Sequence, residues 1–298
     1  MISSKERMDL NTYLNSDIEI VNTKEFYLPI IIFSILVVII YNSAFENNTY
    51  SCNNVVANVY LYVLLSLVLF HIFTLLFVKN KTIRYLRFLQ NKLGPYVFLI
   101  LFILVMIGLF SLFFSLQTNI IGSHILLVVL VALCSYILSY LFILLKMQGL
   151  YNQVIFTTVA LIFGLMCIFY YKQDLLIPYL QNDKIYITMI IICIIVIILS
   201  IIYYYLYGYS KILRIIVASI IVVLFTYILL ADTQKILEIT PNQCKKALSE
   251  CNKSISSTKC NLDKYPSYPQ KGYEIFSDII EIARNIAHIF LAANNDDI

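Results

Sequence analysis

The sequence contains no tryptophan, only 7 glycines and only 13% charged residues among its 298 positions. Soluble domains carry nearer a quarter charged residues, so the low charge excludes an ordinary soluble domain. The few glycines exclude a bundle held mainly by small-residue contacts, and packing is expected to use large side chains. Zinc-ligand spacings, glycine-rich phosphate loops and nucleic-acid motifs are absent, and the net charge of +4 indicates no nucleic-acid partner.

Apolar residues make up 61% of the chain, and its mean hydropathy is +0.85. They occur in runs of about twenty or more, the length at which a helix crosses roughly 30 Å of hydrocarbon. The alternation of apolar and polar residues typical of a membrane β-barrel is missing. The sequence therefore predicts an all-α, polytopic membrane helix bundle in the lipid bilayer.

Hydropathy predicts seven strong spans and a weaker, half-polar C-terminal membrane helix at 274–293. The strong spans are expected at 26–45, 55–78, 93–117, 120–145, 150–171, 185–207 and 211–232. Residues 1–25 form a polar N-terminal segment, 26–294 a single transmembrane domain, and 295–298 a tail. A polar loop at 233–273 is the only large insertion expected in this domain.

The short loops indicate an orientation, because cytosolic loops carry an excess of Lys and Arg. The 79–92 loop carries five basic residues, whereas 46–54 and 118–123 carry none. Alternate counting places the N-terminus in the cytosol and the 233–273 loop in the lumen or exterior. Four cysteines then share the non-cytosolic side, where an oxidising compartment would allow two disulfides, whereas in the opposite orientation they would be cytosolic and reduced. They are Cys52, Cys244, Cys251 and Cys260.

The segment 273–292, YEIFSDIIEIARNIAHIFLA, has one polar and one apolar side at 100° per residue. The polar stripe consists of Glu274, Ser277, Asp278, Glu281, Arg284, Asn285 and His288. Two interpretations remain open. The helix lies flat on the membrane surface, or it is embedded with the stripe facing the bundle interior, where ionisable groups usually mark a functional path.

Two stretches resemble the transmembrane Bax inhibitor motif family, and the Bax inhibitor-one branch in particular. FTYILLADTQKILE, at 225–238, is similar to the Asp-Thr-Gln signature that ends a late span. EIFSDIIEIARNIAHIFLAANN, at 274–295, is similar to the family's half-polar last helix, with Arg284 six positions after Asp278. The resemblance implies a multi-helix protein of internal or plasma membranes that leaks calcium in a pH-sensitive way and restrains cell death.

Carried over from the family, Asp232 and Asp278 form the gate, pH sensor and calcium path. Two close carboxylates in a low-dielectric bundle cannot both ionise freely, so they titrate as one unit. Carboxylate oxygens also suit Ca²⁺, which is expected as a permeant ion, with no other cofactor. The second shell around the gate is expected to comprise Gln234, Glu281, Arg284 and His288.

This chain departs from the family pattern in the number of its spans and in their orientation. The family core has seven helices, so either 26–45 is an addition or one of 185–207 and 211–232 does not cross fully. The family pattern also puts the Asp-Thr-Gln end in the cytosol, opposite to the side that the loop charges indicate.

An endoplasmic reticulum or other internal membrane is expected, with plasma or viral membranes as alternatives. Cell-death regulators are expected as partners. The alternative function is that of a structural or scaffolding multi-pass protein, for example a viral membrane component, without transport activity. Paired nucleophiles and metal ligands are missing, so no enzymatic activity is expected.

Overall fold

The computed structural model describes residues 22–46, 49–79, 107–108, 111, 120–180, 183–207, 210–253 and 267–294. These residues are almost entirely helical, which confirms the predicted all-α class, and they include one short antiparallel hairpin. Contacts divide the chain into an N-terminal unit (2–143 and 236–274) and a C-terminal unit (144–235 and 275–298). The prediction of a single domain stays a prediction.

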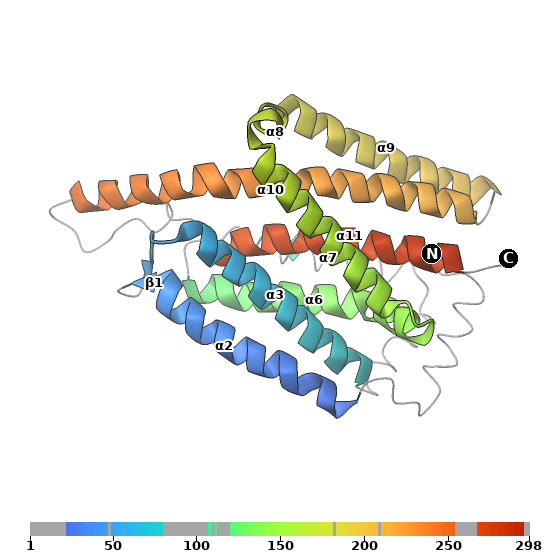
Figure 1. Ribbon diagram of the computed structural model, residues 1–298, viewed down its shortest axis with the longest axis horizontal. Coiled ribbons are helices and arrows are strands. Elements are labelled where there is room, and N and C mark those ends of the chain that lie inside the picture. Colours follow the sequence, from blue (N-terminus) through green and yellow to red (C-terminus); the bar gives the residue numbers. More distant parts are fainter. Residues whose placement is uncertain are drawn as a thin grey trace. The chain divides into compact units, whose positions relative to one another are not determined.

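The N-terminal unit begins with two antiparallel helices joined by the hairpin (Figure 1). Its elements are η1 (Thr23–Phe26), α2 (Tyr27–Ala44), β1 (Phe45–Glu46), β2 (Thr49–Tyr50), α3 (Val55–Lys79) and most of α6 (Ile120–Met147). Asn22 starts the first helix with a capping box, in which its side chain accepts from Lys24 N and Glu25 accepts from Asn22 N. The hairpin pairs Phe45 with Tyr50, so α3 returns beside α2.

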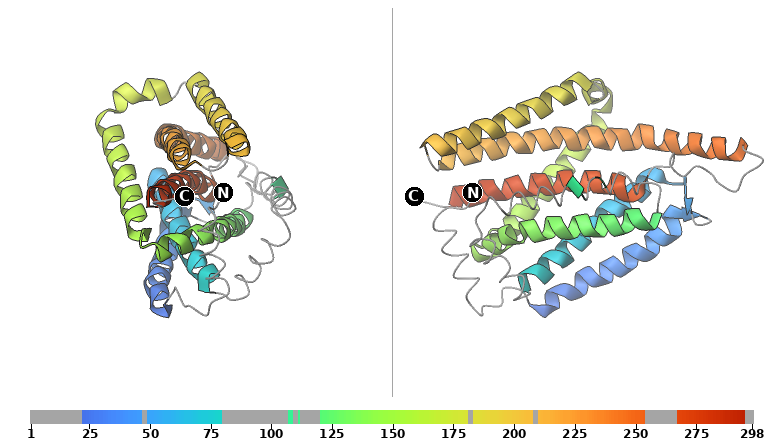
Figure 2. Two further views of the ribbon diagram at one scale, coloured as in Figure 1. Left: turned by 90° about the vertical axis from the view of Figure 1, so that its right-hand side faces the viewer. Right: turned by 180° about the vertical axis from the view of Figure 1, so that it is seen from behind.

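The C-terminal unit begins at an α6–α7 turn, where Gly149 adopts a left-handed φ of 69°. Its helices are α7 (Tyr151–Tyr171), α8 (Gln173–Leu180), α9 (Asp183–Tyr207), and parts of α10 (Lys211–Lys253) and α11 (Tyr268–Asn294). Phe169, Leu180 and Ala231 form a buried core where α7 and α8 meet α10. Figure 2 shows α7 and α9 joined through α8 in its end-on view.

Helix α10 differs from the predicted loop, because it continues without interruption through 233–253. The segment 233–253 has no glycine, and Leu, Lys, Glu and Gln are good helix formers. Pro241 lies inside the helix and removes one backbone donor, but it does not end the helix. Hydropathy predicts only where the apolar part of the helix ends. The helix itself can continue into water where its residues favour helix formation and its packing allows it.

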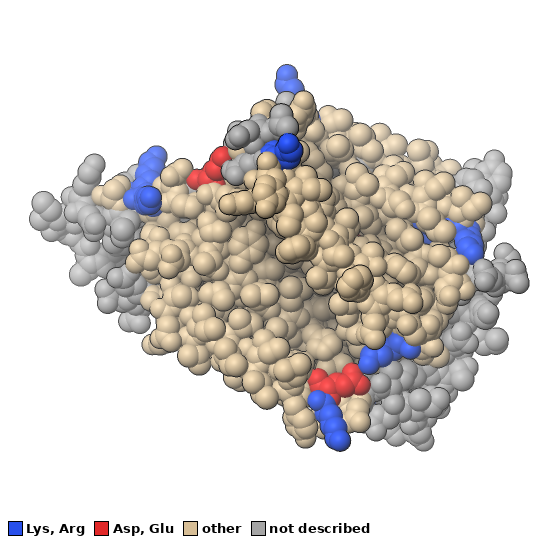
Figure 3. All heavy atoms as spheres, viewed as in Figure 1, with Lys and Arg blue, Asp and Glu red and all other residues tan. Residues whose placement is uncertain are grey.

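Five described helices are long and apolar enough to cross a membrane. They are Thr23–Ala44, Val55–Lys79, Ile120–Met147, Tyr151–Tyr171 and Lys211–Lys246, and they correspond to five of the seven predicted strong spans. The predicted span at 93–117 lies almost wholly outside the described residues, and α9 covers the one at 185–207. Large apolar side chains point outward on these helices, as Tyr27, Leu28 and Tyr41 do on α2. On the face drawn in Figure 3 the charged residues are few and lie near the edges, as expected for a lipid-facing surface.

Candidate functional site

Asp232 lies in the middle of α10, beside the most buried part of that helix. Its carboxylate accepts a 3.0 Å hydrogen bond from Lys235 Nζ and is 16% exposed, whereas Lys235 is 49% exposed. Thr233 and Gln234 are each only 2% exposed. The carboxylate of Asp232, the first residue of the Asp-Thr-Gln stretch, is therefore half-buried and paired with a lysine of its own helix.

Gln234 lies on a different side of α10 from Asp232, because two residues turn a helix by about 200°. It follows Tyr227 and Ala231 by seven and three residues, so it continues their side of the helix. That side meets α7 and α8, where Tyr227 Oη donates to Tyr179 O at 3.0 Å. Both polar atoms of the Gln234 amide lack a hydrogen-bond partner among the described residues. The structure therefore does not join Gln234 to Asp232.

Asp278 is deeply buried in α11, with 5% of its surface exposed. Asn285, one heptad further on, is 3% exposed and donates from Nδ2 to Glu281 O at 2.8 Å. The apolar side is buried too, since Ile275 and Ile282 are at most 1% exposed. A helix lying flat on a surface would leave its polar stripe in water, so the burial favours the interpretation in which the stripe faces the protein interior.

The rest of the stripe forms two polar contacts in the C-terminal unit. Glu281 and Arg284 pair at 2.7 Å, as their spacing of three residues predicts. Arg214 of α10 donates to His288 Nδ1 at 2.8 Å. Because that nitrogen accepts, it carries no proton, and the neutral imidazole has its proton on Nε2. Of the second-shell residues of α11, His288 contacts α10 through Arg214, whereas Glu281 and Arg284 pair with each other. Asp232 itself is bonded to Lys235 and not to Asp278.

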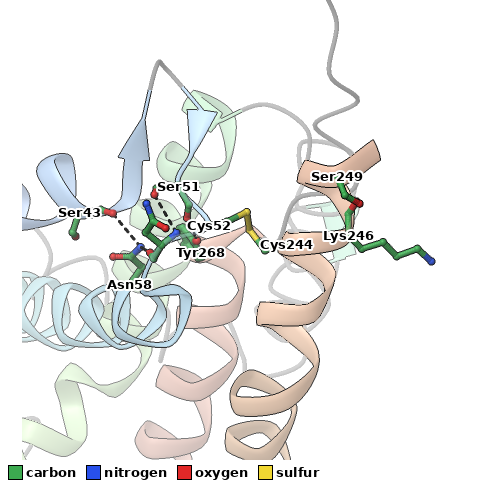
Figure 4. The surroundings of a disulfide bond; sticks show 9 residues. Ser43, Ser51, Cys52, Asn58, Cys244, Lys246, Ser249 and Tyr268 are labelled. Carbon is green, nitrogen blue, oxygen red and sulfur yellow. Dashed lines mark hydrogen bonds between the residues drawn. A yellow bond between two sulfur atoms is a disulfide. The ribbon is translucent and has the colours of Figure 1, made fainter. Parts of the chain in front are cut away.

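The described residues contain one disulfide between the predicted cysteines, Cys52–Cys244, with a Cα–Cα distance of 5.6 Å (Figure 4). It joins the segment after the hairpin to α10, 192 residues later. The side chain of Cys251 and all of Cys260 lie outside the described residues. Cys134 and Cys167, both within helices, are not in disulfides, and Cys134 Sγ lies 3.6 Å from Tyr273 Oη.

The sequence did not predict a buried cluster of tyrosines and a histidine that lies beside this disulfide. His124 Nδ1 donates to Ile120 O at 2.6 Å, so its Nε2 accepts from Tyr62 Oη. Tyr50 Oη bonds Ser123 Oγ at 3.3 Å, and Tyr268 Oη donates to Ser51 O. No local pattern indicates this cluster, because its partners are 62 or more residues apart.

Burial keeps the tyrosines at the edge of this cluster protonated. It raises the pKa of Tyr50 to about 12, and likewise raises the pKa of Tyr268 to about 12. The neutral hydroxyls therefore remain hydrogen-bond donors throughout the physiological pH range. The cluster ties the hairpin to the starts of α3, α6 and α11, all within the N-terminal unit.

Replacing Tyr62 with phenylalanine is expected to destabilise the protein by about 1–2 kcal/mol, because His124 Nε2 is left buried without a donor. Thermal unfolding in detergent, followed by circular dichroism, measures the change. Tyr41→Phe is the matched control, since Tyr41 is 71% exposed. Equal melting temperatures for the two variants would contradict a stabilising role for the Tyr62–His124 bond.

Comparison with known proteins gives one family. A family model described as "Inhibitor of apoptosis-promoting Bax1" matches residues 52–296, which is most of the chain. Searches of curated proteins and of solved structures give no match. The matched region includes both the Asp-Thr-Gln stretch and α11, and it begins after α2. The resemblance seen in the two motifs is thereby confirmed, and the chain belongs to the Bax inhibitor-one-like family of integral membrane proteins.

Proposed function

We propose that the protein is a pH-sensitive calcium leak of an internal membrane, most simply the endoplasmic reticulum, and that it restrains cell death. Asp232 and Asp278 form its gate and line the calcium path. Family membership and the burial of Asp278, which is 5% exposed, support this proposal. The proposal assigns no catalytic step to the chain, and its partners are the bilayer, calcium and cell-death regulators.

The observation that carries the proposal is the contact between α10 and α11. Arg214 and Asp232 are eighteen residues apart, which is five full turns, so they project from the same side of α10. Arg214 reaches His288, which shares the polar stripe of α11 with Asp278. Figure 1 shows the two helices running antiparallel. The shared sides of Arg214 with Asp232 and of His288 with Asp278 support a gate on the facing sides of α10 and α11. Asp232 lies about 27 Å from Arg214 along α10, and Asp278 lies about 15 Å from His288 along α11, so the two carboxylates of the proposed gate differ in depth by about 12 Å.

The Asp232–Lys235 ion pair represents the closed gate in this proposal. With Lys235 bound, the Asp232 carboxylate is neutralised and offers little attraction to a cation. When Lys235, which is half exposed, swings into solvent, Asp232 and Asp278 present two carboxylates to a hard cation. Protonation of the pair removes that charge, so the leak depends on pH.

The test is calcium flux from liposomes holding the purified protein, stepped from pH 8 to pH 6. The variant Asp232→Asn with Asp278→Asn is expected to lose the pH dependence, so that the ratio of the two rates falls to about one. Glu274→Gln is the matched control, because it removes an acidic residue of α11 that pairs with Lys271 at 2.7 Å. Unchanged flux in the double variant would refute the gate. No leak in the wild type would favour the scaffolding function.

A further inference from the structure

The Cys52–Cys244 disulfide lies at one end of the N-terminal unit, among residues that hold it in place (Figure 4). Cys244 is completely buried, and Tyr268 donates to the carbonyl of Ser51 next to Cys52. The sulfur of Cys244 is shielded from attack by other thiols, whereas Cys52 is half-buried, so the burial favours a structural bond over an exchanging one. Such bonds form and persist in oxidising compartments and are rare in the cytosol.

Helices α3 and α6 both start at this end. Cys52 stands three residues before α3, and Tyr62 of α3 bonds His124 in the second turn of α6. Tyr50 bonds Ser123, which also lies near the start of α6. With 25 and 28 residues, the helices extend about 37 and 42 Å away from the disulfide, enough to cross the bilayer.

The far ends of these helices carry positive charge. Lys79 ends α3 and opens the 79–92 loop with its five basic residues, and Lys146 lies in the last turn of α6. Short loops rich in Lys and Arg stay in the cytosol. The disulfide, which indicates an oxidising compartment, and the basic residues, which indicate the cytosol, therefore lie at opposite ends of the same two helices. The two indications are independent of each other.

We propose that the Cys52–Cys244 end faces the lumen or the exterior, and that the ends of α3 and α6 at Lys79 and Lys146 face the cytosol. The inference does not depend on the proposed leak. It selects the orientation given by the loop charges over the one implied by the family resemblance. The additional helix α2, which precedes the matched residues 52–296, accounts for the reversal, because one extra span inverts every span after it.

This orientation also places Asp232 relative to the membrane. Lys211 starts α10, and Asp232 follows 21 residues later, about 32 Å along the helix. That length matches the hydrocarbon thickness, so Asp232 lies at the non-cytosolic border. The carboxylate is accordingly reached by protons and calcium of the lumen or exterior, and the end of α10 beyond it projects into that compartment.

The test uses a full-length variant that keeps Cys52 and Cys244 and carries serine at the other five cysteines. A single reporter cysteine is added at Met147 or at Ser249, both of which are exposed. Sealed microsomes with the cytosolic face outward are treated with a membrane-impermeant maleimide. Met147→Cys is expected to react at once, and Ser249→Cys at least tenfold faster after permeabilisation.

A second measurement needs no variant. Wild-type membranes are alkylated without reductant and digested, and the peptides are analysed by mass spectrometry for the Cys52–Cys244 cross-link. A cross-linked peptide is expected. Free, alkylated Cys52 and Cys244 in the wild type, or immediate labelling of Ser249→Cys in sealed microsomes, would overturn the proposed orientation.

Discussion

Gly272→Ala is expected to lower the stability of the protein by about 2–3 kcal/mol, because the new methyl group has no room. A Cβ at this position would lie 2.5 Å from Tyr62 Cβ, 3.1 Å from Tyr62 C and 3.2 Å from Val63 N. Two of these atoms are backbone and cannot rotate away. α11 and α3 would therefore have to separate, and the buried bonds of Tyr62 and Tyr268 would be strained with them.

Gly164→Ala is the matched control for this experiment. Gly164 also lies within a helix, but no heavy atom would be within 4 Å of its new Cβ. Alanine is a better helix former than glycine, so this variant should be neutral or more stable by about 0.5–1 kcal/mol. Melting followed by circular dichroism in detergent compares the two. If Gly272→Ala and Gly164→Ala melted at the same temperature, the result would contradict the close approach of α11 to α3.

Removing the Cys52–Cys244 disulfide is the second large expected effect. Cys52→Ser with Cys244→Ser should cost about 2–4 kcal/mol of stability. A closed loop of 192 residues would predict a loss at the upper end of the usual range. Helices that stay inserted in the bilayer or micelle limit the freedom of the unfolded chain, which places the expectation below that end.

Reductant provides the control for the disulfide prediction. It should lower the melting temperature of the wild type to that of the double serine variant and leave the variant unchanged. Cys167→Ser should behave like the wild type, because Cys167 is a free thiol. A wild type that is insensitive to reductant after full reduction would show that the bond contributes nothing to stability.

The sequence predicted the features that depend on local composition. Runs of apolar residues identified five helices that are long and apolar enough to cross a membrane. The period of the polar stripe identified α11 as a helix with two chemically different sides. The two motifs were sufficient to recognise the family. The cysteine positions also indicated disulfide formation, although the sequence left the pairing open.

Other features depend on residues that are distant in the chain and lie close only after folding. Tyr62 touches both His124 and Gly272, and nothing near any of the three residues indicates it. The burial of Asp278 was one of two alternatives, because the sequence of α11 does not show what packs against its polar stripe. The continuation of α10 to Lys253 was missed because hydropathy reports where the apolar surface ends, not where the helix ends.

Because α10 is one uninterrupted helix, a small bend near one end displaces the other end by a much larger distance. Its far end is pinned by the bond at Cys244, and Pro241, three residues away, lacks one backbone hydrogen bond and is the weakest point for bending. A swing of about 5° about this pivot moves Asp232, about 14 Å away, by only about 1 Å, and moves Arg214, about 40 Å away, by about 4 Å. The Arg214–His288 contact would then break before the Asp232 carboxylate moved appreciably, so the Lys211 end of α10 would be the first to respond to the motion.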